Sequence, residues 1–188
     1  MIKISTLFKK DPSDLGRVIN EVNPENQWVM DGEGYPTRKW DGTACAIIGG
    51  LLYKRYDVKK GKTVPDGAIP CQEADEITGH WPHWVLCERA NPADKYHFEA
   101  LDRLCREEYP QDGTYELCGE KINGNRENVV GHELIPHGNI VLIGLVDGYT
   151  FDDVRNYLEK VNIEGIVFHH QHDGRMCKIR KSDFGIKR

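Results

Sequence analysis

Lys39-Trp40-Asp41-Gly42 is the stretch from which the interpretation of this chain starts. A lysine two residues before an Asp-Gly pair suits a reactive amine held on a tight turn between two strands. An ordinary exposed lysine before a turn gives the same pattern, so the stretch is not decisive alone. Three further motifs follow it in order: Gly119-Glu120, Glu164-Gly165-Ile166-Val167 and Lys178-Ile179-Arg180. Together the four motifs indicate one chemistry rather than four coincidences.

Length and charge limit the alternatives. With 188 residues, the chain is expected to form one domain, residues 1–188, with a core that needs no disulfide or metal. The net charge of -5 argues against nonspecific coating of nucleic acid, although not against a local basic groove. Lysine and arginine gather at residues 54–62 and 175–188. These clusters suit phosphate binding, and the first suits solvated strand edges equally well.

Six cysteines are present, and none forms a Cys-x-x-Cys pair, so no structural zinc site is expected. The N-terminal segment lacks the apolar core of a signal peptide, and no apolar run reaches membrane-spanning length. We therefore expect a cytoplasmic protein with free thiols, without membrane association and without an obligate protein partner.

Hydrophobic periodicity and turn residues predict an α+β fold built on antiparallel sheets. Gly49-Gly50 and Asp173-Gly174 are predicted hairpin turns, and residues 80–84, which hold two tryptophans, a loop. The predicted helices cover residues 11–22, 91–109 and 150–161. The predicted strands cover residues 28–30, 44–48, 51–56, 114–118, 139–146, 165–170 and 176–180.

The chemistry expected of the first motif depends on Lys39. A lysine amine attacks an α-phosphate only in its neutral form, which nearby cations or burial favour. Asp41 is expected to hold the turn, and Gly42 to let the backbone approach a nucleotide closely.

The two C-terminal motifs supply charge of both signs. Glu164 precedes an apolar strand, where its carboxylate suits Mg²⁺; a polar residue that merely ends a loop gives the same pattern. Alternation along the next strand puts Lys178 and Arg180 on one face, where they suit a phosphate clamp or protect an edge strand.

Two further positions each leave a choice open. Glu120 is a candidate acceptor for ribose hydroxyls, and Glu116, which shares its face by parity, is a rival. Lys54 and Arg55 lie on the strand after the lysine motif, and only one of them can face a ligand. We favour Arg55, because its forked guanidinium suits a ribose or phosphate oxygen.

The ordered motifs resemble those of the covalent nucleotidyltransferase superfamily, which comprises ATP-dependent DNA and RNA ligases and mRNA capping enzymes. Within it, the runs KWDGTAC, LCGEKINGN, LIPHGN and EGIVFHH look most like the small family of 5′-to-3′ RNA ligases that includes the vertebrate RNA ligase 1 proteins. The resemblance covers the chain from about Trp28 to Gly185. It implies a nucleotidyltransferase (adenylation) domain of antiparallel sheets flanked by helices.

The resemblance implies a three-step reaction with ATP and Mg²⁺, for which Mn²⁺ substitutes. Lys39 becomes lysyl-AMP, the AMP moves to the 5′-phosphate of an RNA end, and a 3′-hydroxyl then displaces it. By motif position, Glu164 serves the metal-dependent steps and Lys178 contacts the α-phosphate. Glu120 contacts the ribose, and Asp41, Gly42, Arg55 and Arg180 complete the nucleotide site.

The chain departs from the superfamily pattern in two ways. Residues 131–146 contain no Phe, Tyr or Trp to stack on adenine, and His137 is our candidate for that role. No OB-fold is expected after the last motif, which favours RNA ends over DNA ends or caps as the acceptor. The alternatives are nucleotidyl transfer to DNA ends or to protein, and a noncatalytic module that binds nucleotides or RNA ends.

Overall fold

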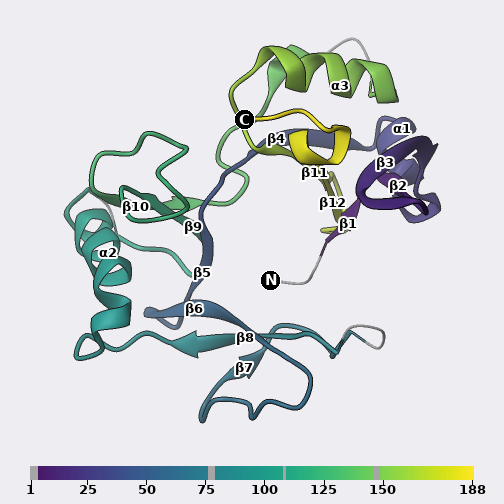
Figure 1. Cartoon of the computed structure of the whole chain (residues 1–188). Coiled ribbons are helices and arrows are strands. Elements are labelled where there is room, and N and C mark those ends of the chain that lie inside the picture. The colour runs from purple at the N-terminus through teal and green to yellow at the C-terminus, as the bar shows by residue number, and fades with distance from the viewer. Residues whose placement is uncertain (1–3, 76–78, 108, 146–148) are drawn as a thin grey trace. The chain divides into compact units, whose positions relative to one another are not determined.

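The computed structural model describes residues 4–75, 79–107, 109–145 and 149–188. In these ranges the chain is a mixed α+β protein with several antiparallel sheets and few helices, which confirms the predicted class (Figure 1). It divides into two compact units, the six-stranded unit (residues 41–137) and the four-stranded unit (residues 4–40 and 138–188). A single domain over residues 1–188 stays a prediction. No helix in the described ranges has both the length and the apolar character needed to cross a membrane.

The six-stranded unit is built on an entirely antiparallel sheet. Its strands, in spatial order, are β10 (His132–Pro136), β9 (Gly113–Gly119), β5 (Thr43–Ile48), β6 (Leu51–Val58), β8 (Trp81–Leu86) and β7 (Ile69–Pro70). The short η2 (Pro92–Asp94) leads into α2 (Lys95–Glu107), which packs against β10 and β6. The buried residues beneath this helix form the core of the unit: Cys45, Ile47, Leu52, Cys87, Ala100, Leu104, Tyr115, Leu117 and Leu134.

Local signals predicted two elements of this unit correctly. Gly49 and Gly50 join β5 to β6 with φ angles of 58° and 75°, the left-handed pair that a two-residue hairpin turn requires. The predicted helix that starts at Asn91 is also present, and the Asn91 side chain accepts a hydrogen bond from the Ala93 amide at 3.0 Å. Its end was predicted too late, because α2 stops at Glu107.

The four-stranded unit contains the C-terminal hairpin. Its main sheet has the order β1 (Ser5–Thr6), β12 (Met176–Arg180), β11 (Gly165–His170) and β4 (Gly34–Lys39), antiparallel except for the β1–β12 pair. A separate hairpin joins β2 (Phe8–Asp11) to β3 (Asp14–Val22). The helical elements are η1 (Pro24–Asn26), α1 (Gln27–Met30), η3 (Ile143–Leu145), α3 (Phe151–Lys160) and η4 (Lys181–Phe184).

The core of this unit lies between the sheet and α3. It contains Leu7, Phe8, Val18, Trp28, Val29, Val154, Leu158, Ile163, Ile166, Phe168, Cys177 and Ile179. The predicted helix at residues 150–161 is confirmed, and its capping box is formed by Thr150 and Asp153. The predicted strands at residues 165–170 and 176–180 are confirmed as well.

The helix predicted at residues 11–22 is wrong, since this segment is the β2–β3 hairpin. Asp11 pairs with Asp14, and its carboxylate accepts a hydrogen bond from the Ser13 amide at 2.8 Å, so it organises a turn rather than a helix start. The helical spacing of apolar residues was coincidental. Val18 is buried, whereas Leu15 is 74% exposed.

Two predicted strands are also wrong. Residues 28–30 belong to α1, a single turn too short for periodicity to distinguish from a strand. Residues 139–145 form an isolated bridge at Val141 and the 3-10 turn η3, while residue 146 lies outside the described residues. Ile140, Val141 and Ile143 are exposed, whereas Leu142 of the same run packs against the core of the four-stranded unit.

The loop predicted at residues 80–84 is largely the strand β8, which begins at Trp81 and pairs with β6. Proline is confined mainly to strands near a sheet edge, and Pro82 fits that rule, because only the two-residue β7 lies beyond β8. Trp84 is buried but does not belong to the core cluster given above, so the packing of the indoles on that core stays a prediction. All six cysteines are free, as predicted.

Candidate active site

Strand register in the four-stranded unit places three predicted cations on one face of the sheet. Gly165 of β11 lies opposite Lys39 of β4 on one side and Arg180 of β12 on the other. Two residues further along β11, Val167 lies opposite Lys178. Side chains of directly opposed residues, and of residues two apart, share a face. Lys39, Lys178 and Arg180 therefore project from the same face.

The other face of these strands is apolar. Ile166 and Ile179, which alternate with the residues above, are fully buried in the core of the unit. Burial of this face fixes the register, because a slip by one residue would turn the isoleucines outward. The hydrophobic pattern of β11 and β12 is thus what directs the cations away from the core.

Lys39 is paired with Glu164, the residue immediately before β11. Its ammonium nitrogen lies 2.5 Å from Glu164 Oε2 and 3.4 Å from the Trp40 carbonyl oxygen. Both side chains of the pair are 22% exposed, so the pair is mostly buried yet reachable from solvent. Lys39, the predicted nucleophile, and Glu164, the predicted metal-binding carboxylate, are thus in direct contact although they lie 125 residues apart in sequence.

Position 165, immediately after Glu164, requires a glycine for steric reasons. A Cβ atom added to Gly165 would lie 2.2 Å from the Ile179 carbonyl oxygen, closer than any real contact. Only glycine lets β11 and β12 approach this closely at the end where Glu164 and Arg180 lie. The Glu-Gly motif therefore combines a predicted site residue with the glycine that lets the two strands approach.

Lys178 lies in an environment that opposes its charge. Burial, together with the positive charges of Lys39 and Arg180, lowers its pKa from the ordinary value of 10.5 to about 8, against the attraction of Glu164 and Asp183. A half-buried ammonium close to two other cations is a costly arrangement. Perturbed groups of this kind concentrate at functional sites.

Arg180 is held by a carboxylate that the sequence analysis missed. Asp183 is fully buried and accepts hydrogen bonds from the Arg180 amide at 2.8 Å, from its guanidinium at 3.0 Å and from Lys10 Nζ at 2.6 Å. Burial would raise the pKa of Asp183, but the hydrogen bonds from Arg180 and Lys10 outweigh it and lower the pKa below its usual value. The three-residue spacing from Arg180 to Asp183, typical of a capping box, was the available signal.

Asp41 and Gly42 belong to the six-stranded unit, where they are bound to a loop after β9. Asn123 Nδ2 donates to Asp41 Oδ1 at 3.1 Å and to the Gly42 carbonyl oxygen at 2.8 Å, and the Asp41 amide donates to Glu127 at 2.8 Å. A Cβ on Gly42 would lie 2.2 Å from the Leu117 carbonyl oxygen. The glycine thus permits close packing on β9, a reason that the sequence analysis did not give.

His137 has both ring nitrogens engaged. Nδ1 lies 3.0 Å from Thr114 Oγ1 and Nε2 lies 2.9 Å from Glu116 Oε2, which fixes the plane of the ring. Glu116 is buried and also accepts the Gly42 amide at 3.0 Å. Its rival Glu120 is exposed and accepts the Gly131 amide at 3.1 Å. Glu116 therefore has a structural task, while Glu120 keeps an outward position.

Lys54 and Arg55 have different partners. The Lys54 ammonium forms an ion pair with the fully buried carboxylate of Asp94, at the start of α2. Arg55 projects from the opposite face of β6 and pairs with Asp57 at 3.1 Å. Only Arg55 lies on the face of the sheet that also carries Glu116.

The structure therefore brings together Lys39, Glu164, Lys178 and Arg180 in the four-stranded unit. In the six-stranded unit, Asp41 and Gly42 share Asn123, and Gly42 and His137 share Glu116, while Arg55 and Glu120 have partners of their own. Nucleotide contacts by these five residues stay predictions. The chain matches no protein-family model and has no significantly similar curated protein.

Proposed function

We propose that this chain is an ATP-dependent RNA ligase with a nucleotidyltransferase fold, which joins 5′-phosphate and 3′-hydroxyl RNA ends through lysyl-AMP. One observation carries the proposal: the Lys39–Glu164 ion pair lies in a sheet whose adjacent strands present Lys178 and Arg180 on the face of Lys39. A nucleophile, a carboxylate and two further cations are the groups that phosphoryl transfer needs.

In the first step, Lys39 Nζ attacks the α-phosphorus of ATP, the bond to the β-phosphate oxygen breaks, and pyrophosphate leaves. Nζ loses a proton, and Glu164 Oε2, 2.5 Å away, is placed to receive it. The cations of Lys178 and Arg180 stabilise the negative charge on the phosphoryl oxygens. A 5′-phosphate oxygen of RNA then displaces Lys39 from the AMP. Finally the 3′-hydroxyl attacks that phosphate and AMP leaves.

The carboxylate of Glu164 fits Mg²⁺. This ion prefers oxygen ligands and is usually held by one or two carboxylates together with substrate phosphates and water. Glu164 is partly exposed, whereas the neighbouring carboxylate of Asp183 is fully buried and engaged by Arg180 and Lys10. When bound, the ion neutralises charge on the transferring phosphate. Mn²⁺ accepts the same ligands and is expected to substitute.

The decisive experiment is incubation with α-labelled ATP and Mg²⁺ followed by denaturing electrophoresis. We expect label on the wild-type protein and none on Lys39→Ala. Glu164→Ala should fold normally yet take up label at least about 100-fold more slowly. Lys160→Ala, an exposed lysine on α3, is the matched control and should match the wild type. A wild-type protein that never takes up label would refute the mechanism.

The acceptor is tested separately, with open RNA ends, nicked RNA and nicked DNA offered in competition. We expect the RNA substrates to be sealed. Preferred sealing of nicked DNA would show that the acceptor is a DNA end rather than an RNA end. Label on Lys39 without sealing of any substrate would favour transfer to protein. ATP binding without release of pyrophosphate would favour the noncatalytic module. Free thiols at all six cysteines suit a reducing compartment, and we propose the cytoplasm as the place of action.

A further inference from the structure

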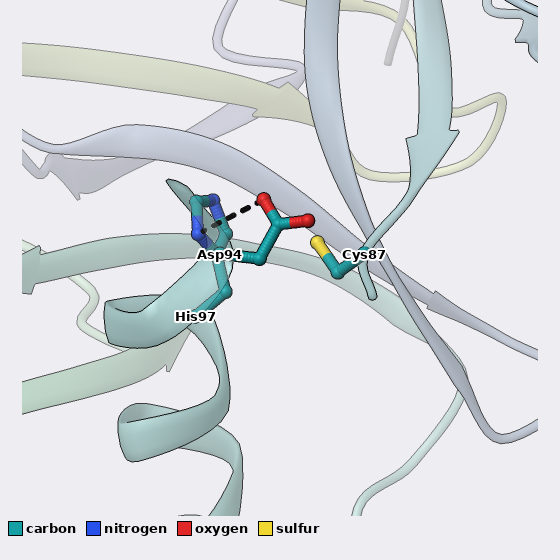
Figure 2. Close-up of side chains that lie close together, drawn as sticks. All are labelled: Cys87, Asp94 and His97. Carbon is teal, nitrogen blue, oxygen red and sulfur yellow. Dashed lines mark ion pairs between the residues drawn. The ribbon is translucent and has the colours of Figure 1, made fainter. Parts of the chain in front are cut away.

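Three side chains with different donor atoms lie close together in the six-stranded unit. The sulfur of Cys87, a carboxylate oxygen of Asp94 and a ring nitrogen of His97 all lie within 4.8 Å of one another. Figure 2 shows the Asp94 carboxylate between the His97 ring and the Cys87 sulfur. All three belong to this one unit, whereas Lys39, Glu164, Lys178 and Arg180 belong to the four-stranded unit.

The sequence brings these groups together over eleven residues. Cys87 follows β8, and its amide donates to the Leu52 carbonyl oxygen of β6 at 2.9 Å. The chain then turns and starts the η2–α2 segment, on which Asp94 and His97 are three residues apart. Side chains at this spacing lie on one side of a helix. The helix thus presents an oxygen and a nitrogen to the sulfur at the end of the strand.

The cluster is buried and not fully hydrogen-bonded. Cys87 is 6% exposed and Asp94 is fully buried. His97 Nδ1 is buried and forms no hydrogen bond within the described part of the chain, and it lies 4.0 Å from Asp94 Oδ1. A buried polar atom without a partner is rare in folded proteins and calls for an explanation, of which a bound ion is one.

We propose that Cys87, Asp94 and His97 bind a zinc ion. Thiolate and imidazole together with one carboxylate oxygen are a donor set for zinc rather than for Mg²⁺ or Ca²⁺. In tetrahedral zinc sites the ligand atoms are separated by about 3.3–3.8 Å, so a closure of roughly 1 Å brings this cluster into range. Binding forms bonds from the ion to Sγ, Nδ1 and an Asp94 oxygen, and releases the thiol proton of Cys87 to solvent.

The proposal has a testable consequence for Lys54. Its ammonium is paired with Asp94 Oδ1, and the second Asp94 oxygen accepts the Glu88 amide at 3.0 Å. A zinc ion and this ammonium compete for the same carboxylate and repel each other. Zinc binding therefore displaces Lys54. A variant without the ammonium, Lys54→Met, should bind zinc more tightly, by about tenfold or more.

The test uses the full chain, with zinc affinity measured by competition against a chromophoric chelator. We expect one zinc ion per chain, and loss of binding by at least about 100-fold in Cys87→Ser and in His97→Gln. Cys105→Ser is the matched control, because Cys105 is an exposed cysteine on α2, the helix that carries His97. This variant should bind zinc like the wild type. Circular dichroism confirms that each variant is folded.

Cobalt provides a second measurement that needs no variant. Co²⁺ bound to the wild-type protein should give a thiolate-to-metal charge-transfer band and visible bands of a tetrahedral ion, both removed by zinc. The absence of a thiolate band overturns the proposal. So does zinc binding that Cys87→Ser leaves unchanged, or a Lys54→Met variant that binds zinc more weakly. None of these results depends on whether Lys39 reacts with ATP.

Discussion

Replacement of Lys178 by methionine should make the protein more stable. Burial and the nearby charges of Lys39 and Arg180 lower the pKa of Lys178 from 10.5 to about 8. The unfolded chain therefore binds this proton more tightly than the folded protein does. The charged lysine costs stability at every pH below about 8, and the cost fades as the pH rises towards 10.5. At about 1.4 kcal/mol per pH unit, it amounts to about 3 kcal/mol at pH 7.

Lys178→Met keeps most of the side-chain volume and removes the charge. We expect its free energy of unfolding to exceed that of the wild type by about 3 kcal/mol at pH 7, but by only about 1 kcal/mol at pH 9.5. Urea unfolding at the two pH values measures both numbers. Lys160→Met, a change of an exposed lysine on α3, should shift stability by less than about 0.5 kcal/mol at either pH.

The same variant should lose function. If Lys178 contacts the α-phosphate, Lys178→Met takes up label from ATP at least about 100-fold more slowly although it is more stable. A variant that is no more stable than the wild type at pH 7, or whose gain is equal at both pH values, would refute the electrostatic argument. A stabilised variant with full activity would instead refute the phosphate contact.

Two further changes test the framework around this lysine. Asp183→Asn leaves Arg180 and Lys10 without their buried counter-charge and should cost about 3–5 kcal/mol at pH 7. Because the pKa of Asp183 is lowered in the folded protein, the stability that it provides is present above the ordinary pKa of 3.8 and lost below it. The difference between wild type and variant in urea unfolding should thus shrink as the pH falls below 4, and a constant difference would contradict this reasoning. Gly165→Ala introduces a Cβ 2.2 Å from the Ile179 carbonyl oxygen and should destabilise the protein by about 2 kcal/mol or more. Gly113→Ala is the control, because the nearest atom to its added Cβ lies 3.9 Å away, and it should change thermal stability little. Equal melting temperatures for the two alanine variants would rule out the steric account.

The elements that could be predicted from sequence are those whose signal is local. The Gly49-Gly50 turn, the capping box at Thr150 and the alternation along residues 176–180 each specify their structure within a few residues. The helix predicted for residues 11–22 was wrong because the apolar residues of a strand happened to recur at helical spacing. An Asp-Pro pair gives the same local signal at a helix start and in a turn. Only the pairing of this segment with another strand distinguishes the two structures.

The candidate site was predictable to a similar extent. Strand alternation was enough to place Lys178 and Arg180 on one face, and register then added Lys39. The partners that hold these side chains were not predictable. Lys10 reaches Asp183 across 173 residues of sequence, and nothing near either residue indicates the contact.

The cluster of Cys87, Asp94 and His97 has no Cys-x-x-Cys spacing by which the sequence would indicate it. It combines a single cysteine, Cys87, with two donors on the η2–α2 segment, which begins after a turn. The positions of Asp94 and His97 on one side of that helix follow from the sequence. Their distance from Cys87 depends on how α2 packs, which only the tertiary structure reveals.

The charges on the face of the sheet that carries Lys39 bear on the ligand proposed for it. Lys39, Lys178 and Arg180 share this face with two carboxylates, Glu164 and Asp183, and the second carboxylate also neutralises a further lysine. The face therefore keeps an excess of positive charge, which adds to the larger effect of burial in lowering the pKa of Lys178. A phosphate group bound here, as proposed above, would offset that excess, because its oxygens would stabilise the ammonium of Lys178. The stability cost of the charged Lys178 and the proposed affinity for a phosphate would thus have the same origin, so replacement of Lys178 should raise the stability of the protein and weaken phosphate binding.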